Sequence, residues 1–121
     1  MKYLLLIYDN EQEWAALGEK GHLPIYGEYR ALREELVGGG QFLGGSQLMP
    51  TTTATSVRVR DGEQLITDGP FAETREQLGG YFLIEAKNLD EAIAIAARIP
   101  SARMGTVEVR PLAEAGAPAT A

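Results

Sequence analysis

Two segments of the chain are apolar on both faces of the strands that they predict. Residues 2–8 are apolar at odd and at even positions, and residues 81–86 nearly repeat this pattern. Successive side chains of a strand point to opposite faces, so a strand with one face in water alternates between apolar and polar residues. We therefore expect both segments to lie side by side in the centre of a sheet that is covered on both faces.

Helical spacing marks further segments. Residues 24–37 carry apolar side chains at helical intervals, with a proline suited to the first turn and three glycines directly afterwards that end the helix. Asn88 and Glu91 resemble a capping box at the start of a second helix, which ends before Pro100. Residues 9–21 have a weaker pattern, which predicts a short helix followed by a loop.

A tight hairpin is predicted in the middle of the chain. Residues 56–60 and 63–67 flank the dipeptide Asp61-Gly62, the sequence signal for a two-residue type I′ turn. Residues 41–48 and 106–110 supply the remaining two strands.

The expected order is strand, helix, strand, inserted hairpin, strand, helix, strand. This is the split βαβ or ferredoxin-like plan of the α+β class. No internal repeat or second domain is visible, so residues 1–112 are expected to form a single domain. Residues 113–121 are small and lack apolar bulk, which predicts a mobile tail.

The second face of the expected sheet needs a cover. Short connections would place both helices on one face, although the two central strands are apolar on both. Most oligomers of soluble proteins are symmetric assemblies of identical chains. We therefore expect a homodimer in which two sheets stack, and hence a dimeric α+β barrel.

Charge and composition narrow the classes of partner. The chain has 121 residues, a formal net charge of −6 and no cysteine. This charge disfavours nucleic acids and anionic membranes, which attract clustered Lys and Arg. The apolar opening is far shorter than the roughly 20 residues of a membrane span, so a cytoplasmic protein is expected. The chain has one histidine, no cysteine and no spacing typical of metal ligands, so we expect no metal site. It also lacks the sequence fingerprints of nucleotide-binding sites, so we expect no cofactor.

Residues 68–81 (DGPFAETREQLGGY) gather the groups that a small polar ligand site needs. Asp68 is a candidate base or histidine-orienting carboxylate, or else a turn former that binds nearby backbone N–H groups. Phe71 lines a pocket or plugs the core. Arg75 clamps a substrate carboxylate or forms a surface ion pair.

Three other side chains are candidates. His22 is the only histidine, and it either pairs with Asp68 from a loop or is an exposed loop residue. Tyr29 either acts as a hydrogen-bond donor or acid at a pocket, or packs within its helix. Tyr8, at a strand end, lines the pocket or packs in the sheet.

Four segments together resemble a known family. They are MKYLLLIY at the start, VRVRDG before the hairpin, TDGPFAETREQLGGYFLIEA in the middle and VEVRP near the end. They look like the DGPF branch of the YCII-related proteins, and the likeness covers nearly the whole chain in order. It implies a dimeric α+β barrel with a cleft that contains an Asp, here Asp68, and often a His. Tyr29 stands where many relatives carry that histidine.

Two hypotheses follow. The first is a cofactorless small-molecule enzyme of the lyase or isomerase type, with Asp68 as base or orienting carboxylate and His22 or Tyr29 as its partner. The second rests on the resemblance, because genes of the family often lie beside those of extracytoplasmic-function sigma factors. It is a ligand-binding or regulatory subunit of such a transcription system, without catalysis.

Overall fold

A four-stranded antiparallel sheet carries the fold in the computed structural model, which describes residues 1–113. The strand order is β2-β5-β1-β6. These strands are β1 (Lys2–Asp9), β2 (Phe42–Gln47), β5 (Gln77–Glu85) and β6 (Thr106–Pro111). The class is α+β, as predicted, and the order is compatible with the ferredoxin-like plan.

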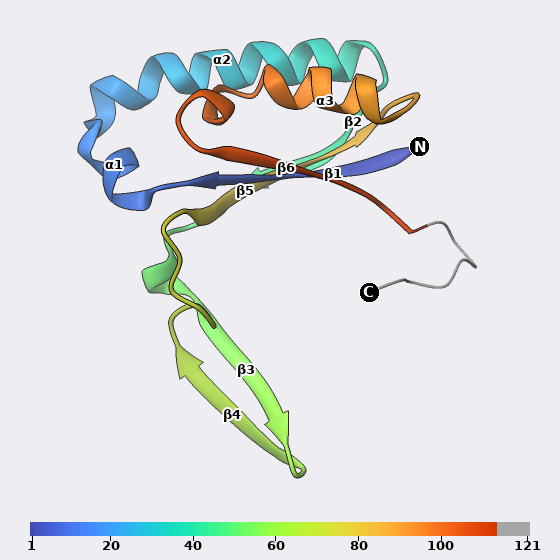
Figure 1. The fold of residues 1–121 in the computed structure, drawn as a ribbon. Helices are drawn as coiled ribbons and strands as arrows, with labels where there is room; N and C mark the ends of the chain where they lie inside the picture. The colour runs from blue at the N-terminus through green and yellow to red at the C-terminus, as the bar shows by residue number, and fades with distance from the viewer. Residues whose placement is uncertain (114–121) are drawn as a thin grey trace.

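Two helices cover one face of this sheet (Figure 1). They are α2 (Gly18–Gly38) and α3 (Leu89–Ala97), while the short α1 (Glu11–Ala16) follows β1 at the end of the sheet. Two 3₁₀ turns complete the connections, η1 (Thr51–Thr53) and η2 (Pro100–Arg103). In residues 1–113 no helix is long and apolar enough to cross a membrane.

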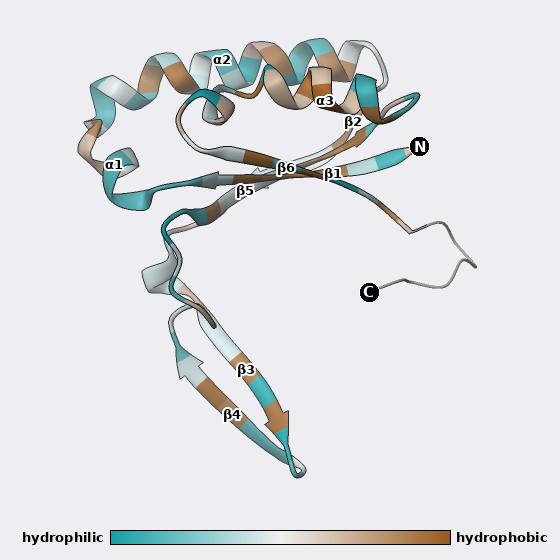
Figure 2. Ribbon diagram, viewed as in Figure 1, coloured by the Kyte–Doolittle hydropathy of each residue, from teal (hydrophilic) through white to brown (hydrophobic). Residues whose placement is uncertain are grey.

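The predicted hairpin is confirmed, and it stands away from the sheet. Strands β3 (Thr55–Arg60) and β4 (Glu63–Asp68) form a separate two-stranded sheet, here named the arm. Asp61 and Gly62 have φ angles of 52° and 77°, the positive values that a type I′ turn requires. The arm projects on the side of the main sheet opposite the helices, and both of its strands carry hydrophobic residues (Figures 1 and 2).

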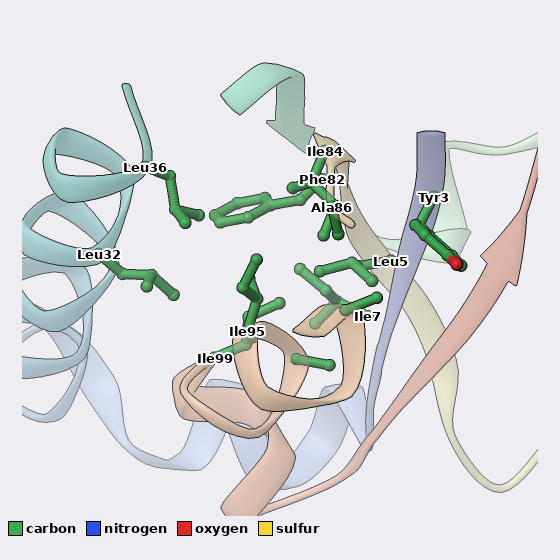
Figure 3. Packing of buried hydrophobic residues seen from close by; sticks show 12 residues of the cluster. Tyr3, Leu5, Ile7, Leu32, Leu36, Phe82, Ile84, Ala86, Ile95 and Ile99 are labelled. Atoms are coloured by element: carbon green, nitrogen blue, oxygen red, sulfur yellow. The ribbon is translucent and has the colours of Figure 1, made fainter. Parts of the chain in front are cut away.

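The core lies between the sheet and the helices (Figure 3). The odd residues Tyr3, Leu5 and Ile7 of β1 are buried there, together with Phe82 and Ile84 of β5 and several helix residues. The helix residues are Leu32, Leu36, Ala92, Ile95 and Ala96. Alternation along the strands therefore decides which side chains meet the helices.

The other sheet face is apolar and only half-buried in the single chain. The register places Leu4 opposite Leu83 and Leu6 opposite Tyr81. With Tyr8, these four residues form what we call the open face, and each is half-buried. The prediction that the central strands are apolar on both faces is thus confirmed. Within residues 1–113, the helices cover one of these two faces.

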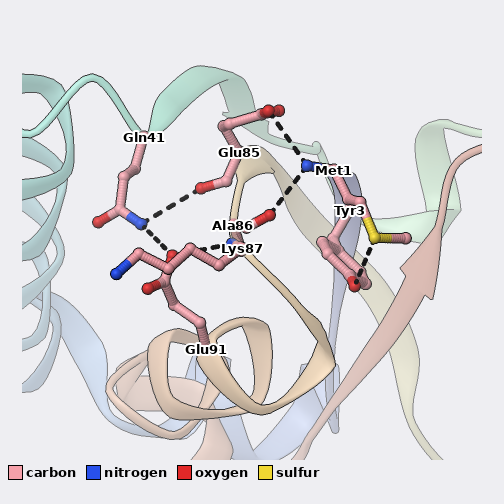
Figure 4. Close-up of polar contacts among 7 residues, drawn as sticks. All are labelled: Met1, Tyr3, Gln41, Glu85, Ala86, Lys87 and Glu91. Carbon is pink, nitrogen blue, oxygen red and sulfur yellow. Dashed lines mark hydrogen bonds and ion pairs between the residues drawn. The ribbon is translucent and has the colours of Figure 1, made fainter.

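Hydrogen bonds join the start of β1 to the end of β5 and the start of α3 (Figure 4). The amino group of Met1 donates to Ala86 O at 2.9 Å and to Glu85 Oε1 at 3.1 Å. Gln41 Nε2 and Lys87 N donate to Glu91 Oε1 at 2.9 and 3.1 Å. These bonds fix the end of the sheet that is remote from α1.

Helix α2 begins earlier than the sequence pattern predicted. It starts at Gly18 rather than Pro24, so Pro24 lies inside it and His22 is helical rather than part of a loop. The imidazole of His22 stacks on Trp14 with ring centroids 4.1 Å apart. This contact with α1 holds the additional turns in place. Residues 114–121 of the expected tail lie outside the described residues.

Gly105 lies between η2 and β6, where the chain passes close to the end of β1. A Cβ atom at this position would lie 2.0 Å from Tyr8 O and 3.0 Å from Asp9 Oδ1. Gly105→Ala should therefore force the backbones apart and lower the free energy of unfolding by about 1–3 kcal/mol, the usual cost of overpacking.

The matched control is Gly27→Ala, because a Cβ at Gly27 on α2 would meet nothing within 4 Å. It should raise the free energy of unfolding by about 0.5–1 kcal/mol, because alanine is the better helix former. Urea unfolding followed by circular dichroism measures both. Equal midpoints for Gly105→Ala and the wild type would contradict the close approach.

Candidate functional site

A groove of about 960 Å³ lies between α2 and the helix-side surface of the sheet near β2. Its walls are mainly apolar and aromatic, with a few polar groups, which is the usual composition of a small-molecule site. The apolar and aromatic lining residues include Ile7, Trp14, Tyr26, Val37, Phe42, Leu48, Met49 and Phe82. The charged and hydroxyl lining residues include Asp9, Glu11, Tyr29, Arg30, Arg33, Glu34 and Ser101.

Three of the polar lining residues form a hydrogen-bonded chain. The hydroxyl of Ser101 donates to Asp9 Oδ2 at 2.9 Å, and the Tyr29 hydroxyl lies 2.7 Å from Ser101 Oγ. A serine hydroxyl has a single hydrogen, which Ser101 gives to Asp9, so the hydrogen between Tyr29 and Ser101 belongs to the phenol. The chain of donors therefore runs from Tyr29 through Ser101 to Asp9.

The surroundings change the proton affinity of both ends of this chain. Burial raises the pKa of Asp9, the Ser101 hydrogen bond opposes that rise, and the negative charge of Glu76 adds to it. Burial also raises the pKa of Tyr29 above its usual value, although the bond to Ser101 counteracts it. Asp9 is thus a stronger base than an ordinary aspartate, and the phenol of Tyr29 stays protonated as a donor.

Three separate elements bring these residues together. Asp9 continues the buried odd-numbered face of β1 and is the first charged residue on it. Tyr29 belongs to the apolar face of α2 and packs against the core. Ser101, in η2, is 1% exposed. The parity of β1 could have identified Asp9 from the sequence, whereas no local pattern distinguishes Ser101.

Aromatic rings form one end of the groove. The rings of Trp14 and Tyr26 meet edge to face with centroids 5.8 Å apart. The imidazole of His22 stacks on the Trp14 ring. His22 Nε2 lies 2.7 Å from Trp14 O, and since a carbonyl only accepts, Nε2 carries the hydrogen. His22 thus supports two residues that line the groove without lining it itself.

Two arginines of α2 contribute positive charge to the groove. The guanidinium of Arg33 lies over the Phe42 ring, 5.1 Å from its centroid. Arg30 also lines the groove, and neither arginine forms an ion pair within residues 1–113. The Glu11 carboxylate, by contrast, is occupied by Thr51, whose backbone N and Oγ1 donate to it at 2.8 and 2.7 Å.

Of the six residues predicted from the sequence, Tyr29 lines the groove. Asp68 is exposed at the base of the arm, opposite Thr55, and Phe71 and Arg75 are exposed in the following loop. Tyr8 lies on the open face, where its hydroxyl donates to Glu108 at 3.4 Å. The His22 ring is bonded to Trp14 rather than to Asp68. The roles assigned to these residues stay predictions.

The segment that contains the sequence motif is attached to the neighbourhood of Asp9. Asn10 Nδ2 donates to Arg75 O at 3.1 Å, and the backbone N of Glu11 donates to Gln77 Oε1 at 2.9 Å. Glu76 accepts from Thr106 Oγ1 at 2.8 Å, and its charge contributes to the raised pKa of Asp9. The motif therefore reaches the groove in two ways, because Gly79 and Gly80 line it and the charge of Glu76 acts on Asp9. Within residues 1–113, no group of three or more His, Asp or Glu side chains is placed to hold a metal ion.

The raised pKa of Asp9 predicts a pH dependence of stability. The folded chain binds a proton at Asp9 more tightly than the unfolded chain does. Lowering the pH from neutrality through this raised pKa therefore stabilises the fold, and the gain is complete below about pH 4, where the unfolded chain is protonated as well. Asp9→Asn cannot titrate but can still accept from Ser101. We expect the unfolding free energy of the wild type to rise relative to Asp9→Asn across this window.

Urea unfolding at a series of pH values measures this difference. Ser101→Ala removes the bond that lowers the pKa, so it should move the window to higher pH. If the unfolding free energy of the wild type minus that of Asp9→Asn stayed constant or fell on acidification, the raised pKa of Asp9 would be contradicted.

Comparison with known proteins gives the family. The model of the YCII-related domain matches residues 1–115. An uncharacterized protein of Rhizobium meliloti (strain 1021) is 37% identical over 115 residues, which cover 93% of this chain and 93% of that protein. The predicted likeness to the YCII-related proteins is thereby confirmed. The chain belongs to the YCII-related family.

Proposed function

We propose that this protein is a cofactorless small-molecule enzyme of the lyase or isomerase type, which transfers protons in the groove beside α2. One observation carries the proposal. It is the directed chain from Tyr29 through Ser101 to Asp9, which places a protonated donor and a basic carboxylate on the wall of one groove.

Each residue of the chain has a distinct role. Asp9 accepts a proton from a carbon next to a substrate carbonyl, a task that suits a carboxylate with a raised pKa. When substrate binds, the Tyr29 phenol turns its single hydrogen from Ser101 Oγ to the carbonyl oxygen, where negative charge develops. Ser101 positions both groups before substrate binds, and its hydroxyl keeps donating to Asp9 Oδ2 afterwards. Protonated Asp9 then returns the proton to another carbon, or to a departing group.

The walls of the groove indicate the substrate class. Trp14, Phe42 and Phe82 offer an apolar and aromatic surface. Arg30 and Arg33 offer guanidinium groups, which bind carboxylates well. A carboxylic acid with an apolar body and a carbonyl group next to an acidic C–H fits both features.

We also propose that the chain acts as a homodimer in which the open faces of two sheets stack as a dimeric α+β barrel. The support is the open face itself, because Leu4, Leu6, Tyr81 and Leu83 form a continuous apolar layer on central strands. Stacked sheets pack about 10 Å apart and exclude water from such a layer.

A ligand-binding or regulatory subunit of a sigma-factor transcription system is the second candidate. The size of the groove, about 960 Å³, favours it, because a groove of this size can enclose a ligand without turnover. Such a subunit would bind the same apolar acids and release them unchanged. Its association with the partner protein would depend on the ligand.

Proton exchange in D₂O tests the enzymatic proposal. Apolar 2-oxo acids are incubated with the protein, and ¹H NMR follows the loss of the signal from the C–H next to the carbonyl. Asp9→Asn should slow exchange by about 10²–10⁴-fold, the usual contribution of a general base. Tyr29→Phe should also slow exchange, because it removes the donor.

Asp68→Asn is the matched control, since it makes the same change at the exposed carboxylate of the motif. It should leave exchange within about twofold of the wild type. If Asp68→Asn lost proton exchange while Asp9→Asn kept it, Asp68 rather than Asp9 would be the catalytic base. Saturable binding without exchange by any acid would favour the regulatory subunit.

A further inference from the structure

The arm exposes four large aliphatic side chains. Val57, Val59, Leu65 and Ile66 are 60%, 58%, 46% and 63% exposed. Within residues 1–113 its two strands pair only with each other. An isolated two-stranded hairpin is marginally stable in water, and an apolar hairpin with free edges favours aggregation. These side chains therefore need a surface to cover them.

The register gathers three of these side chains on one face. Val57 lies directly opposite Ile66, and Val59 lies two residues along the same strand. Because side chains alternate along a strand, these three residues point to the same side, which we call the apolar arm face. Arg58, Leu65 and Thr67 point to the other side.

The position of the arm indicates where a protein surface that covers it would lie. The arm extends from the main sheet on the side away from the helices, which is the side of the open face (Figure 1). Each arm strand has six residues, or about 20 Å of extended chain, while stacked sheets lie about 10 Å apart. A body stacked on the open face would therefore lie beside most of the arm.

We propose that the arm is a clasp that closes on a second copy of this chain, with Val57, Val59 and Ile66 against that copy. Each chain presents one arm and one open face on the same side, so a single two-fold axis covers both surfaces of both copies. The clasp rests on the homodimer proposed above and is independent of catalysis.

Neighbouring substitutions on opposite faces of the arm provide the first test. Ile66→Lys places a charge on the apolar arm face, and Thr67→Lys places the same charge on the other face. Analytical ultracentrifugation should find the dimer dissociation constant raised about tenfold or more by Ile66→Lys, as expected for a lost buried aliphatic contact. Thr67→Lys should change it by less than about threefold. Both positions are exposed and outside the core, so both variants should fold.

Isotope-filtered NMR provides the second test. A mixture of ¹³C-methyl-labelled and unlabelled protein should give intermolecular NOEs from the methyl groups of Val57, Val59 and Ile66. A stable dimer that lacks these NOEs and tolerates Ile66→Lys would overturn the clasp and leave the homodimer intact. A monomer at all micromolar concentrations would overturn both. Neither result would alter the proton-exchange comparison of Asp9→Asn and Asp68→Asn.

Discussion

The period-two alternation of β1 is the constraint on which the rest of the structure depends. Odd residues from Tyr3 to Ile7 meet the helices and form the core, and the next odd residue is Asp9, at the groove. The even residues form much of the open face. Because strand geometry allows only these two directions, a shift of one residue would bury the wrong set and move Asp9 to the opposite side. Core, groove and open face thus share one register.

Features with a local signal could be predicted from the sequence. Asp61-Gly62 identified the hairpin turn, and the Asn88 cap marked the start of α3. The start of α2 was predicted too late, because Pro24 suits a first turn and the earlier turns depend on His22 stacking on Trp14. That contact joins two helices and leaves no periodic trace in the sequence.

The candidate site was less accessible to sequence reasoning. Tyr29 was identified, but Ser101 and Asp9 are 92 positions apart and become partners only when η2 folds back onto the end of β1. Residues 68–81 were predicted to form the site because their side chains are chemically versatile. Their observed contacts are structural ones: Gly69 N donates to Ala54 O at 2.7 Å at the base of the arm, and Arg75 O accepts from Asn10. At the groove itself the motif contributes the backbone of Gly79 and Gly80, and the charge of Glu76 acts on Asp9.

Asn10 connects α1 to the loop of the motif, beside the bond from Glu11 N to Gln77 Oε1. Its Oδ1 accepts from Glu13 N at 2.9 Å and caps α1, while its Nδ2 holds the loop at Arg75. Because one side chain makes both bonds, local opening of either segment disturbs the Asn10 side chain that also binds the other. Trp14, which α1 carries, is part of the groove wall. The width of the groove is therefore coupled to the order of a loop that does not line it.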